Sequence, residues 1–241
     1  MKVLFTSLFT LLTVISFSQK VEDDLKPFNK LIVDPHIDVE LRKGDREKIE
    51  VFYNNIDPQD IYAEHSGNTL HVYLKDAKIG WNLLKNDNFN DHKYSNTTVR
   101  MVITYVELNN IQFRGEERLI CNDELTTMRL KIRVFGETEV RLTSIDAAKF
   151  KLALYGENEL TISGGQVDNQ IINTYGENRV DVRNLTSYGI RTTNFGENKL
   201  QINATDYLKA TYFGEGELYY TGNPIIERKW LLGEVDVRNI R

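Results

Sequence analysis

The sequence predicts an all-β protein whose C-terminal half is a β-solenoid, similar to a parallel β-helix, preceded by a strand-rich N-terminal part. Glycine followed directly by glutamate recurs at a nearly constant interval, with seven such glycines at positions 115, 136, 156, 176, 196, 214 and 233. The intervals between these glycines are 18 to 21 residues long and contain strand-type alternation without helical periodicity. Strand composition repeating at about 20 residues is typical of stacked β coils, here about seven of them.

The first 18 residues, MKVLFTSLFTLLTVISFS, have the three-part pattern of a secretory signal peptide. One lysine at position 2 precedes an apolar run from Val3 to Phe17, which small residues end. The run is too short for a comfortable membrane span, and no second apolar span follows. We therefore expect cleavage near Ser18, no transmembrane span in the mature chain, and a location in the periplasm, at the outer surface or outside the cell.

Residues 19–110 are predicted to form a β-strand region. The segments HIDVEL (36–41), KIEVFY (48–53) and TLHVYL (69–74) alternate apolar and polar residues between turn signals. Between residues 77 and 97, Asn, Asp and Lys predominate, which predicts a long surface loop with one helical turn near 81–84. The segment TVRMVITYVEL then begins another strand at residue 98.

Residues 111–241 contain the repeats and should continue directly from the N-terminal part. Positions at even distances from each glycine are mostly apolar, so they should face the core. The glycine shares this inward parity and should permit a bend or a positive φ. The second residue after the glycine also shares it, and in three repeats it is an asparagine that should join a buried amide ladder: Asn158, Asn178 and Asn198.

Positions at odd distances from the glycine should face outward. The residue before the glycine forms an aromatic column of Phe135, Tyr155, Tyr175, Phe195 and Phe213. The residue after it forms a glutamate column of Glu116, Glu137, Glu157, Glu177, Glu197, Glu215 and Glu234. The third residue after it gives a column of mixed charge: Arg118, Glu139, Glu159, Arg179, Lys199, Glu217 and Asp236. In-register stacking, with ~4.8 Å between coils, would place the aromatic and glutamate columns side by side.

The glutamate column has several interpretations. Unit charges ~4.8 Å apart in water repel by about 0.9 kcal/mol per pair. Pairing with Arg118, Arg179 or Lys199, raised pKa values, or Ca²⁺ ions bridging the coils would each relieve this repulsion. Alternatively, the glutamates cap turn N–H groups on a solvated surface. Apart from the calcium alternative, we assign no metal or other cofactor.

The aromatic column has two interpretations. Its rings can stack on sugar rings while the adjacent carboxylates accept hydrogen bonds from sugar hydroxyls, or they can pack on each other as a stabilising ladder. The ladder is the favoured interpretation. The candidate binding residues from both columns are Tyr155, Tyr175, Phe195, Phe213, Glu137, Glu157, Glu177, Glu197 and Glu215.

The sequence contains no recognisable catalytic motif: a nucleophile elbow, a zinc-protease helix, a phosphate loop and a dinucleotide-binding loop are all absent. Cys121, the single cysteine, has inward parity and is predicted to be a buried, inert thiol. The spacing of His36, His65, His71 and His92 matches no usual zinc-ligand pattern. A net charge of −5 at pH 7 disfavours nucleic acid as a partner.

The glycine-centred repeat and the signal peptide together resemble a family of exported bacterial proteins described as putative auto-transporter adhesin, head GIN domain. FNKLIVDPHIDVELRKGDREKIEV resembles the start of that family, and VRMVITYVELNNIQFRGE resembles its entry into the first repeat. LYYTGNPIIERKWLLGEVDV, with Tyr220, Gly222 and Pro224, resembles its closing segment. The resemblance covers about residues 27–240. The chain differs from the family in having Gly-Glu-Asn where Gly-Ser-Gly-type repeats are usual.

The resemblance implies an adhesin-like protein of unknown function and supplies no catalytic residue. We expect a non-enzymatic envelope or surface protein that binds glycan or another protein through the outward aromatic and glutamate columns. A structural envelope scaffold is one alternative. A polysaccharide-acting β-helix enzyme is a weaker alternative, because it would need an irregular cluster of acids with Lys or Arg, and the repeats are regular.

Overall fold

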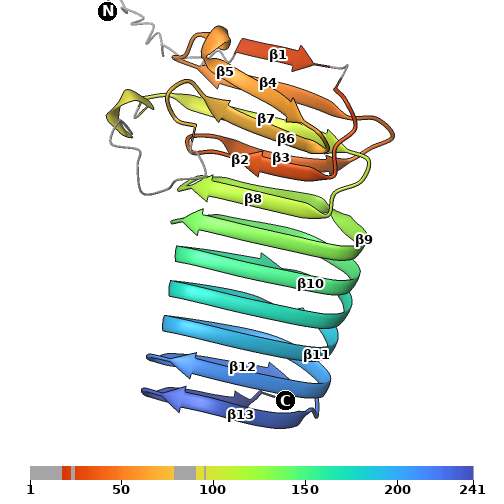
Figure 1. Ribbon diagram of the computed structural model, residues 1–241, viewed down its shortest axis with the longest axis vertical. Coiled ribbons are helices and arrows are strands. Elements are labelled where there is room, and N and C mark those ends of the chain that lie inside the picture. Colours follow the sequence, from red (N-terminus) through yellow and green to blue (C-terminus); the bar gives the residue numbers. More distant parts are fainter. Residues whose placement is uncertain (1–17, 23–24, 79–90, 95, 241) are drawn as a thin grey trace, which may run out of the picture.

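The computed structural model describes residues 18–22, 25–78, 91–94 and 96–240, which form one 14-stranded sheet and two short 3-10 helices. The all-β prediction is confirmed. The strands coil into a solenoid of about six turns, close to the predicted seven (Figure 1). The predicted signal peptide lies outside the described residues except for Ser18, and so does most of the predicted 77–97 loop with its helical turn near 81–84.

The solenoid is built from strands that continue around the bends of the coil. They are β8 (Asn110–Gly115), β9 (Arg118–Gly136), β10 (Glu139–Ile162), β11 (Gly165–Phe213), β12 (Gly216–Thr221), β13 (Ile225–Leu232) and β14 (Val235–Asn239). Neighbouring coils pair in parallel and in register, so that Tyr155 faces Tyr175 and Gly156 faces Gly176. The repeat in the sequence is therefore one coil of the stack.

The N-terminal part adds coils to the same stack. Strands β2 (Lys30–Val33) and β3 (Asp38–Lys43) pair in parallel with β8 and β9 on one side. On their other side they pair in parallel with β6 (Thr69–Leu74) and β7 (Thr98–Tyr105). Strands β3, β4, β6 and β7 match the strands predicted from alternation, whereas the short β2 was missed.

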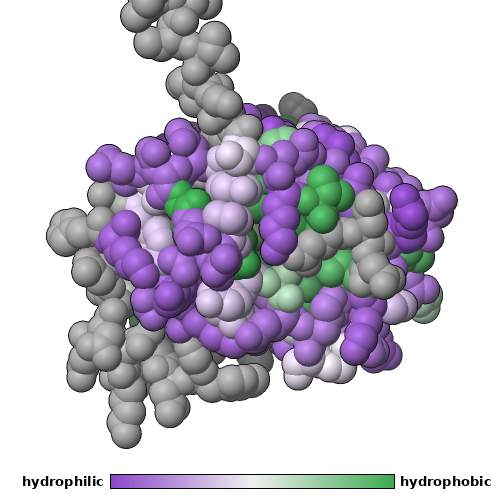
Figure 2. All heavy atoms as spheres, turned by 90° about the horizontal axis from the view of Figure 1, so that it is seen from above, coloured by the Kyte–Doolittle hydropathy of each residue, from purple (hydrophilic) through white to green (hydrophobic). Residues whose placement is uncertain are grey.

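Antiparallel strands lie at the N-terminal end of the stack. Strand β4 (Lys48–Asn54) pairs with β7, β1 (Ser18–Glu22) pairs with β4, and β5 (Ile61–Ser66) pairs with β6. Helix η1 (Pro58–Asp60) precedes β5, and helix η2 (Asp91–Tyr94) precedes β7. The surface seen from this end is mostly hydrophilic with smaller hydrophobic areas (Figure 2). These strands cover the edges that parallel coils would otherwise expose.

The core lies inside the coils and follows the predicted parity. In the coil around Gly156, the side chains of Phe150, Leu152, Leu154, Leu160 and Ile162 are buried. Burying each such side chain stabilises a fold by about 1.5–3 kcal/mol. The equivalent positions around Gly136, Gly176 and Gly196 are also buried, including the polar Thr174, Thr192 and Asn194.

The repeat glycines differ from the prediction in one respect. Gly156 and Gly176 have positive φ values of 108° and 107°, as the predicted bend requires. However, Gly156 is exposed and does not turn into the core. A Cβ on Gly176 would lie 2.4 Å from the carbonyl oxygen of Gly156. The side chain of any other residue here would therefore point along the stack at the preceding coil. Only glycine fits, because each bend packs directly on the bend before it.

Candidate functional site

The candidate site lies at the glycine turns, by which we mean the bends at Gly136, Gly156, Gly176, Gly196 and Gly214. Inside the turns runs the predicted asparagine ladder. The Asn158 side-chain amide donates to Asn178 Oδ1 at 3.0 Å, and Asn178 donates to Asn198 Oδ1 at 3.0 Å. Asn198 closes the ladder by donating to the carbonyl oxygen of Phe195 at 3.0 Å. All three asparagines are buried, so the ladder fixes the shape of the turns from within.

The aromatic column is a continuous stack of rings. Its members are listed in chain order as Phe135, Tyr155, Tyr175, Phe195 and Phe213, and successive centroids lie 4.7, 4.8, 5.3 and 4.7 Å apart. The interplanar angles do not exceed 11°. The self-packing ladder is therefore confirmed. Tyr155 and Phe195 are still 37% and 38% exposed, so the column presents ring edges to solvent.

This stacking limits what the aromatic column can bind. The faces of the inner rings are covered by their neighbours in the ladder, so a sugar ring has no free face of Tyr155, Tyr175 or Phe195 on which to stack. The ring edges and the tyrosine hydroxyls remain accessible for contact. Burial, together with the neighbouring Tyr175, raises the pKa of Tyr155, so this hydroxyl stays neutral at physiological pH.

The glutamate column runs beside the aromatic column as predicted. Glu157 faces Glu177 in register, and all seven column glutamates are exposed. Within the described part of the chain, no basic nitrogen lies within 4.0 Å of any of their carboxylates. Pairing with basic neighbours is not seen for any of the three candidates. Lys199 pairs with Glu217, Arg118 pairs with Asp38, and Arg179 has no carboxylate oxygen within 4.0 Å among the described residues.

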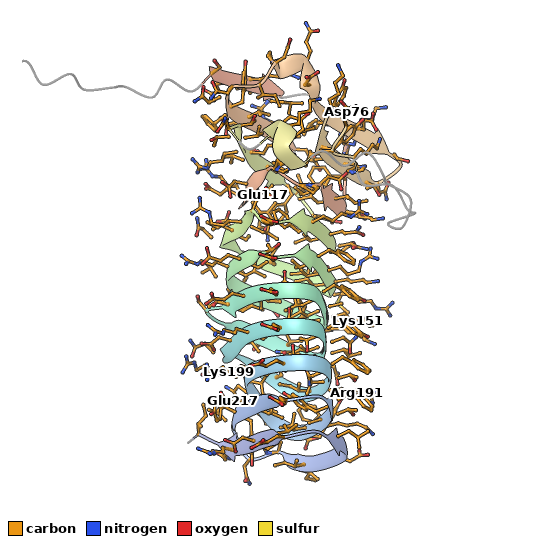
Figure 3. The ribbon with its side chains drawn as sticks, turned by 90° about the vertical axis from the view of Figure 1, so that its left-hand side faces the viewer. Asp76, Glu117, Lys151, Arg191, Lys199 and Glu217 are labelled. Carbon is orange, nitrogen blue, oxygen red and sulfur yellow. The ribbon has the colours of Figure 1, made fainter. Side chains whose placement is uncertain are left out.

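A groove of about 750 Å³ follows the glutamate column along the stack. Its wall on one side is the mixed-charge column, in which Lys199 and Glu217 lie on successive coils (Figure 3). A glutamate of the column recurs on every coil, so the groove offers a row of carboxylates, while the charge of the facing wall varies along the stack. It is lined by Glu157, Asn158, Glu159, Glu177, Asn178, Arg179, Glu197, Asn198, Lys199, Glu215, Gly216, Glu217, Glu234 and Asp236.

The described residues contain no group of three or more His, Cys, Asp or Glu side chains that could hold a metal ion. Calcium takes six to eight oxygen ligands, roughly, and a single file of carboxylates supplies few to any one position. Two of the histidines instead contact single carboxylates, His71 that of Asp34 and His36 that of Glu117. The side chain of His92 lies outside the described residues.

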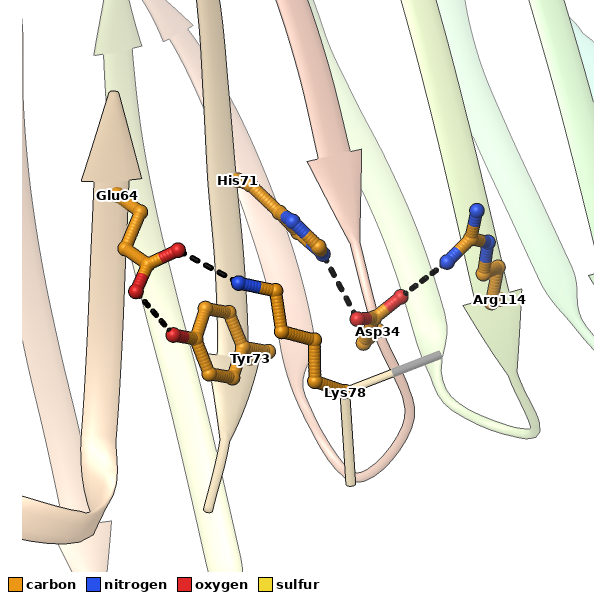
Figure 4. Close-up of polar contacts among 6 residues, drawn as sticks. All are labelled: Asp34, Glu64, His71, Tyr73, Lys78 and Arg114. Atoms are coloured by element: carbon orange, nitrogen blue, oxygen red, sulfur yellow. Dashed lines mark hydrogen bonds and ion pairs between the residues drawn. The ribbon is translucent and has the colours of Figure 1, made fainter. Parts of the chain in front are cut away.

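A second polar cluster, missed in the sequence, joins the N-terminal coils to the first repeat (Figure 4). Asp34 is fully buried and accepts from His71 Nε2 at 2.7 Å and from Arg114 Nη1 at 2.8 Å. Nearby, Glu64 contacts Tyr73 and Lys78, and its pKa is lowered chiefly by the hydrogen bond from Lys78. Asp34 and Arg114 are 80 residues apart, so no local pattern could reveal their contact.

Three side-chain contacts join the N-terminal coils to the first repeat at neighbouring positions of the chain. Asp34 meets Arg114, His36 Nδ1 lies 3.5 Å from Glu117, and Asp38 pairs with Arg118. All three join the turn between β2 and β3 to the turn between β8 and β9. We interpret the cluster as structural, because it fixes the register between the two parts of the stack.

Cys121 is buried, as predicted from its parity. Its Sγ lies 3.8 Å from the hydroxyl of Tyr105. Burial raises the pKa of the thiol, which therefore stays protonated and unreactive at neutral pH.

Comparisons with known proteins agree with this architecture. The model of the family described as putative auto-transporter adhesin, head GIN domain, matches residues 27–224. A search of the curated proteins returns no match. Within the described residues, no helix has the length and apolar character needed to cross a membrane.

Three solved structures share the fold at low sequence identity. A putative adhesin from Bacteroides fragilis has 20% identity and a TM-score of 0.76, covering 94% of this chain and 98% of that one. A putative adhesin from Parabacteroides merdae has 16% identity and a TM-score of 0.70, with 94% and 97% coverage. A putative lipid binding protein from Parabacteroides distasonis has 16% identity and a TM-score of 0.68, with 94% and 98% coverage.

Proposed function

Because the chain belongs to the putative auto-transporter adhesin, head GIN domain family, we propose that it is an exported, adhesin-like protein that performs no catalysis. It acts in the cell envelope or at the cell surface and binds a glycan or a protein at the glycine turns. The signal-peptide pattern of residues 1–18 supports export. Two of the solved neighbours described above carry the adhesin description as well.

One observation carries the assignment of the binding surface: a row of exposed carboxylates that has no basic partner in the described part of the chain. Glu157, Glu177 and Glu197 lie on successive coils, where their mutual repulsion is uncompensated. A ligand that donates hydrogen bonds or carries positive charge would relieve this repulsion. Charge-assisted hydrogen bonds of this kind are about twice as strong as neutral ones.

The shape of the surface selects an extended ligand. The glutamate of the column repeats from coil to coil, so a polymer lying along the stack meets a carboxylate at each step. Sugar hydroxyls or the amide and ammonium groups of a protein segment are suitable donors. The aromatic column contributes ring edges and the Tyr155 and Tyr175 hydroxyls, since its inner ring faces are covered.

Two alternatives are distinguished by particular features. A structural envelope scaffold is favoured by the asparagine and aromatic ladders, which stabilise the stack without any ligand. A glycosidase needs two carboxylates whose environments differ, so that one is protonated and the other ionised. The column glutamates in the groove are instead all exposed to solvent alike, which disfavours the enzyme alternative.

The experiment is a screen of the purified mature chain against glycan and envelope-protein arrays. The triple variant Glu157→Gln, Glu177→Gln, Glu197→Gln keeps the shape of the surface and removes three charges. The control Asp146→Asn, Asp168→Asn, Asp206→Asn removes the same charge about halfway round the coil. We expect the glutamate variant to lose at least about tenfold in affinity and the control to bind normally. A specific ligand that both variants bind as wild type would overturn the assignment of the surface. The absence of any ligand would favour the scaffold.

A further inference from the structure

We infer that the sheet preceding the glycine turns carries a second binding surface, which takes an anionic polysaccharide. This surface, called the basic face below, consists of the outward side chains three, five and seven residues before Gly136, Gly156, Gly176, Gly196 and Gly214. These positions include no Asp or Glu. Their basic members are Arg129, Lys131, Arg133, Lys149, Lys151, Arg191 and Lys209.

The basic side chains are concentrated on two adjacent coils. Lys131 is in register with Lys151, and Arg129 is in register with Lys149. Lys30 extends the group, because it pairs with Asn110, which in turn pairs with Lys131. Coils are ~4.8 Å apart, and alternate residues of a strand are ~6.6 Å apart. Like charges are thus close together in both directions across the face.

These charges are not neutralised by the protein. Among the described residues, no carboxylate oxygen lies within 4.0 Å of the basic groups of Arg129, Lys131, Arg133, Lys149, Lys151 or Arg191. Lys209 differs, because it pairs with Glu227 at 2.8 Å. The buried Nε of Arg133 also has no hydrogen-bond acceptor within the described part of the chain.

The sheet that follows the glycine turns shows the opposite arrangement. Four of its basic side chains have carboxylate partners, in the pairs Arg141–Glu139, Arg183–Asp181, Lys199–Glu217 and Arg238–Asp236. Arg179 differs, because no carboxylate oxygen of the described residues lies within 4.0 Å of it. Figure 3 shows Lys151 and Arg191 on one side of the stack and Lys199 and Glu217 on the other. Basic side chains without a carboxylate partner are therefore concentrated on the basic face.

The pKa of Lys131 is shifted by the same crowding of positive charges. It is lowered by burial first, and then by repulsion from Arg133, Lys151 and Lys30. An anion bound between these side chains would remove the repulsion and satisfy the Arg133 donor. The geometry thus favours an anionic ligand at the positions where the charges are closest.

The flatness of the face and the regular spacing of its charges favour an extended polyanion. A polysaccharide of acidic sugars presents carboxylate or sulfate groups at intervals of one or two rings, which is the scale of the coil spacing. Nucleic acid is disfavoured because its bases would find no free ring face to stack on, since the inner rings of the neighbouring aromatic column cover one another. A lipid membrane is disfavoured because the apolar side chains of the face, such as Ile171, are only partly exposed.

The test measures the binding of the mature chain to polygalacturonate, with neutral dextran as the uncharged reference. The variant Lys131→Gln, Lys149→Gln, Lys151→Gln removes three charges from the basic face. The control Arg141→Gln, Arg183→Gln, Arg238→Gln removes three from the other sheet. We expect wild type and the control to bind polygalacturonate but not dextran. The face variant should bind at least about tenfold more weakly and show a shallower dependence on salt.

The other outcomes overturn the inference. The first is that wild type does not bind polygalacturonate, and the second is that the control and the face variant lose the same affinity for it. The third is that wild type binds phosphatidylglycerol vesicles or a single-stranded oligonucleotide as tightly as polygalacturonate at matched charge. The single substitution Lys151→Gln, at an exposed side chain, keeps the test valid if the triple variant unfolds. This inference concerns a different surface from the glycine turns, so it stands even if the glutamate variant of the proposed function binds normally.

Discussion

The side-chain amide of Asn158 donates a hydrogen bond to Asn178, its equivalent one coil further along the stack, at 3.0 Å. Asn178 donates to Asn198 in the same way, so each amide both donates and accepts. The ladder runs directly behind the glutamate column, one residue away in the sequence. The interior ladder therefore fixes the geometry of the surface that we propose binds the ligand.

Replacing Asn178 with Ala should destabilise the protein by about 2–5 kcal/mol. The change leaves the amide of Asn158 and the carbonyl of Asn198 buried without their partners, and each unsatisfied group costs about 1–3 kcal/mol. Urea denaturation followed by circular dichroism measures the effect. Asn122→Ala, at an exposed asparagine, is the control and should change the free energy of unfolding by less than about 0.5 kcal/mol. Equal effects from both changes would refute the role of the ladder.

Replacing Gly176 with Ala should destabilise the stack by at least about 2 kcal/mol, because a non-glycine residue is strained at a φ of 107°. The new Cβ would also meet the carbonyl oxygen of Gly156 at 2.4 Å. Gly164→Ala is the matched control, because its Cβ would lie 3.7 Å from its nearest neighbour. Thermal unfolding of the two variants compares them directly. A Gly176 variant as stable as the Gly164 variant would contradict the close packing of the turns.

Glu117 should make the stability of the protein depend on pH. Burial is the largest cause that raises its pKa above the usual 4.5, against opposing contributions from His36 and the Glu116 and Glu117 backbone. The folded state therefore holds this proton more tightly than the unfolded state does. Its stabilising contribution is complete below the unfolded pKa and is lost as pH rises through the folded pKa.

The substitution Glu117→Gln tests this dependence. Relative to wild type, the variant should gain stability as pH rises from below 4.5 towards neutrality. Urea denaturation at a series of pH values gives the difference. Glu116→Gln, at the exposed neighbouring residue, should leave the pH profile of wild type unchanged. A Glu117 variant whose profile parallels that of wild type would show that the raised pKa is absent.

Much of the fold was predictable because the repeat encodes it locally. In-register stacking follows from the constant interval, and side-chain parity identified both the buried positions and the asparagine ladder. The arrangement of the N-terminal coils was not predictable. There β6 and β7 stack on β2 and β3, which precede them in the chain, so the parallel pairs join distant segments that share no periodicity.

The candidate site was predicted in part. Parity placed the aromatic and glutamate columns, but it could not show that the rings cover each other's faces or that Lys199 pairs with Glu217. These outcomes depend on side-chain rotamers. The basic face was missed because its members are separated by about one repeat in the sequence, while the net charge of the chain is −5. That most of its basic side chains have no carboxylate partner among the described residues of neighbouring elements is apparent only when the coils are stacked.

The central claim is that the glutamate column contacts one extended ligand across several coils. The most direct measurement is the dissociation constant of the ligand from the array screen for four single variants along the column: Glu157→Gln, Glu177→Gln, Glu197→Gln and Glu215→Gln. We predict weaker binding for at least three consecutive variants and nearly additive losses when they are combined, because separate coils contact separate parts of the ligand. Unchanged affinity in all four variants, with wild-type stability, would contradict the account.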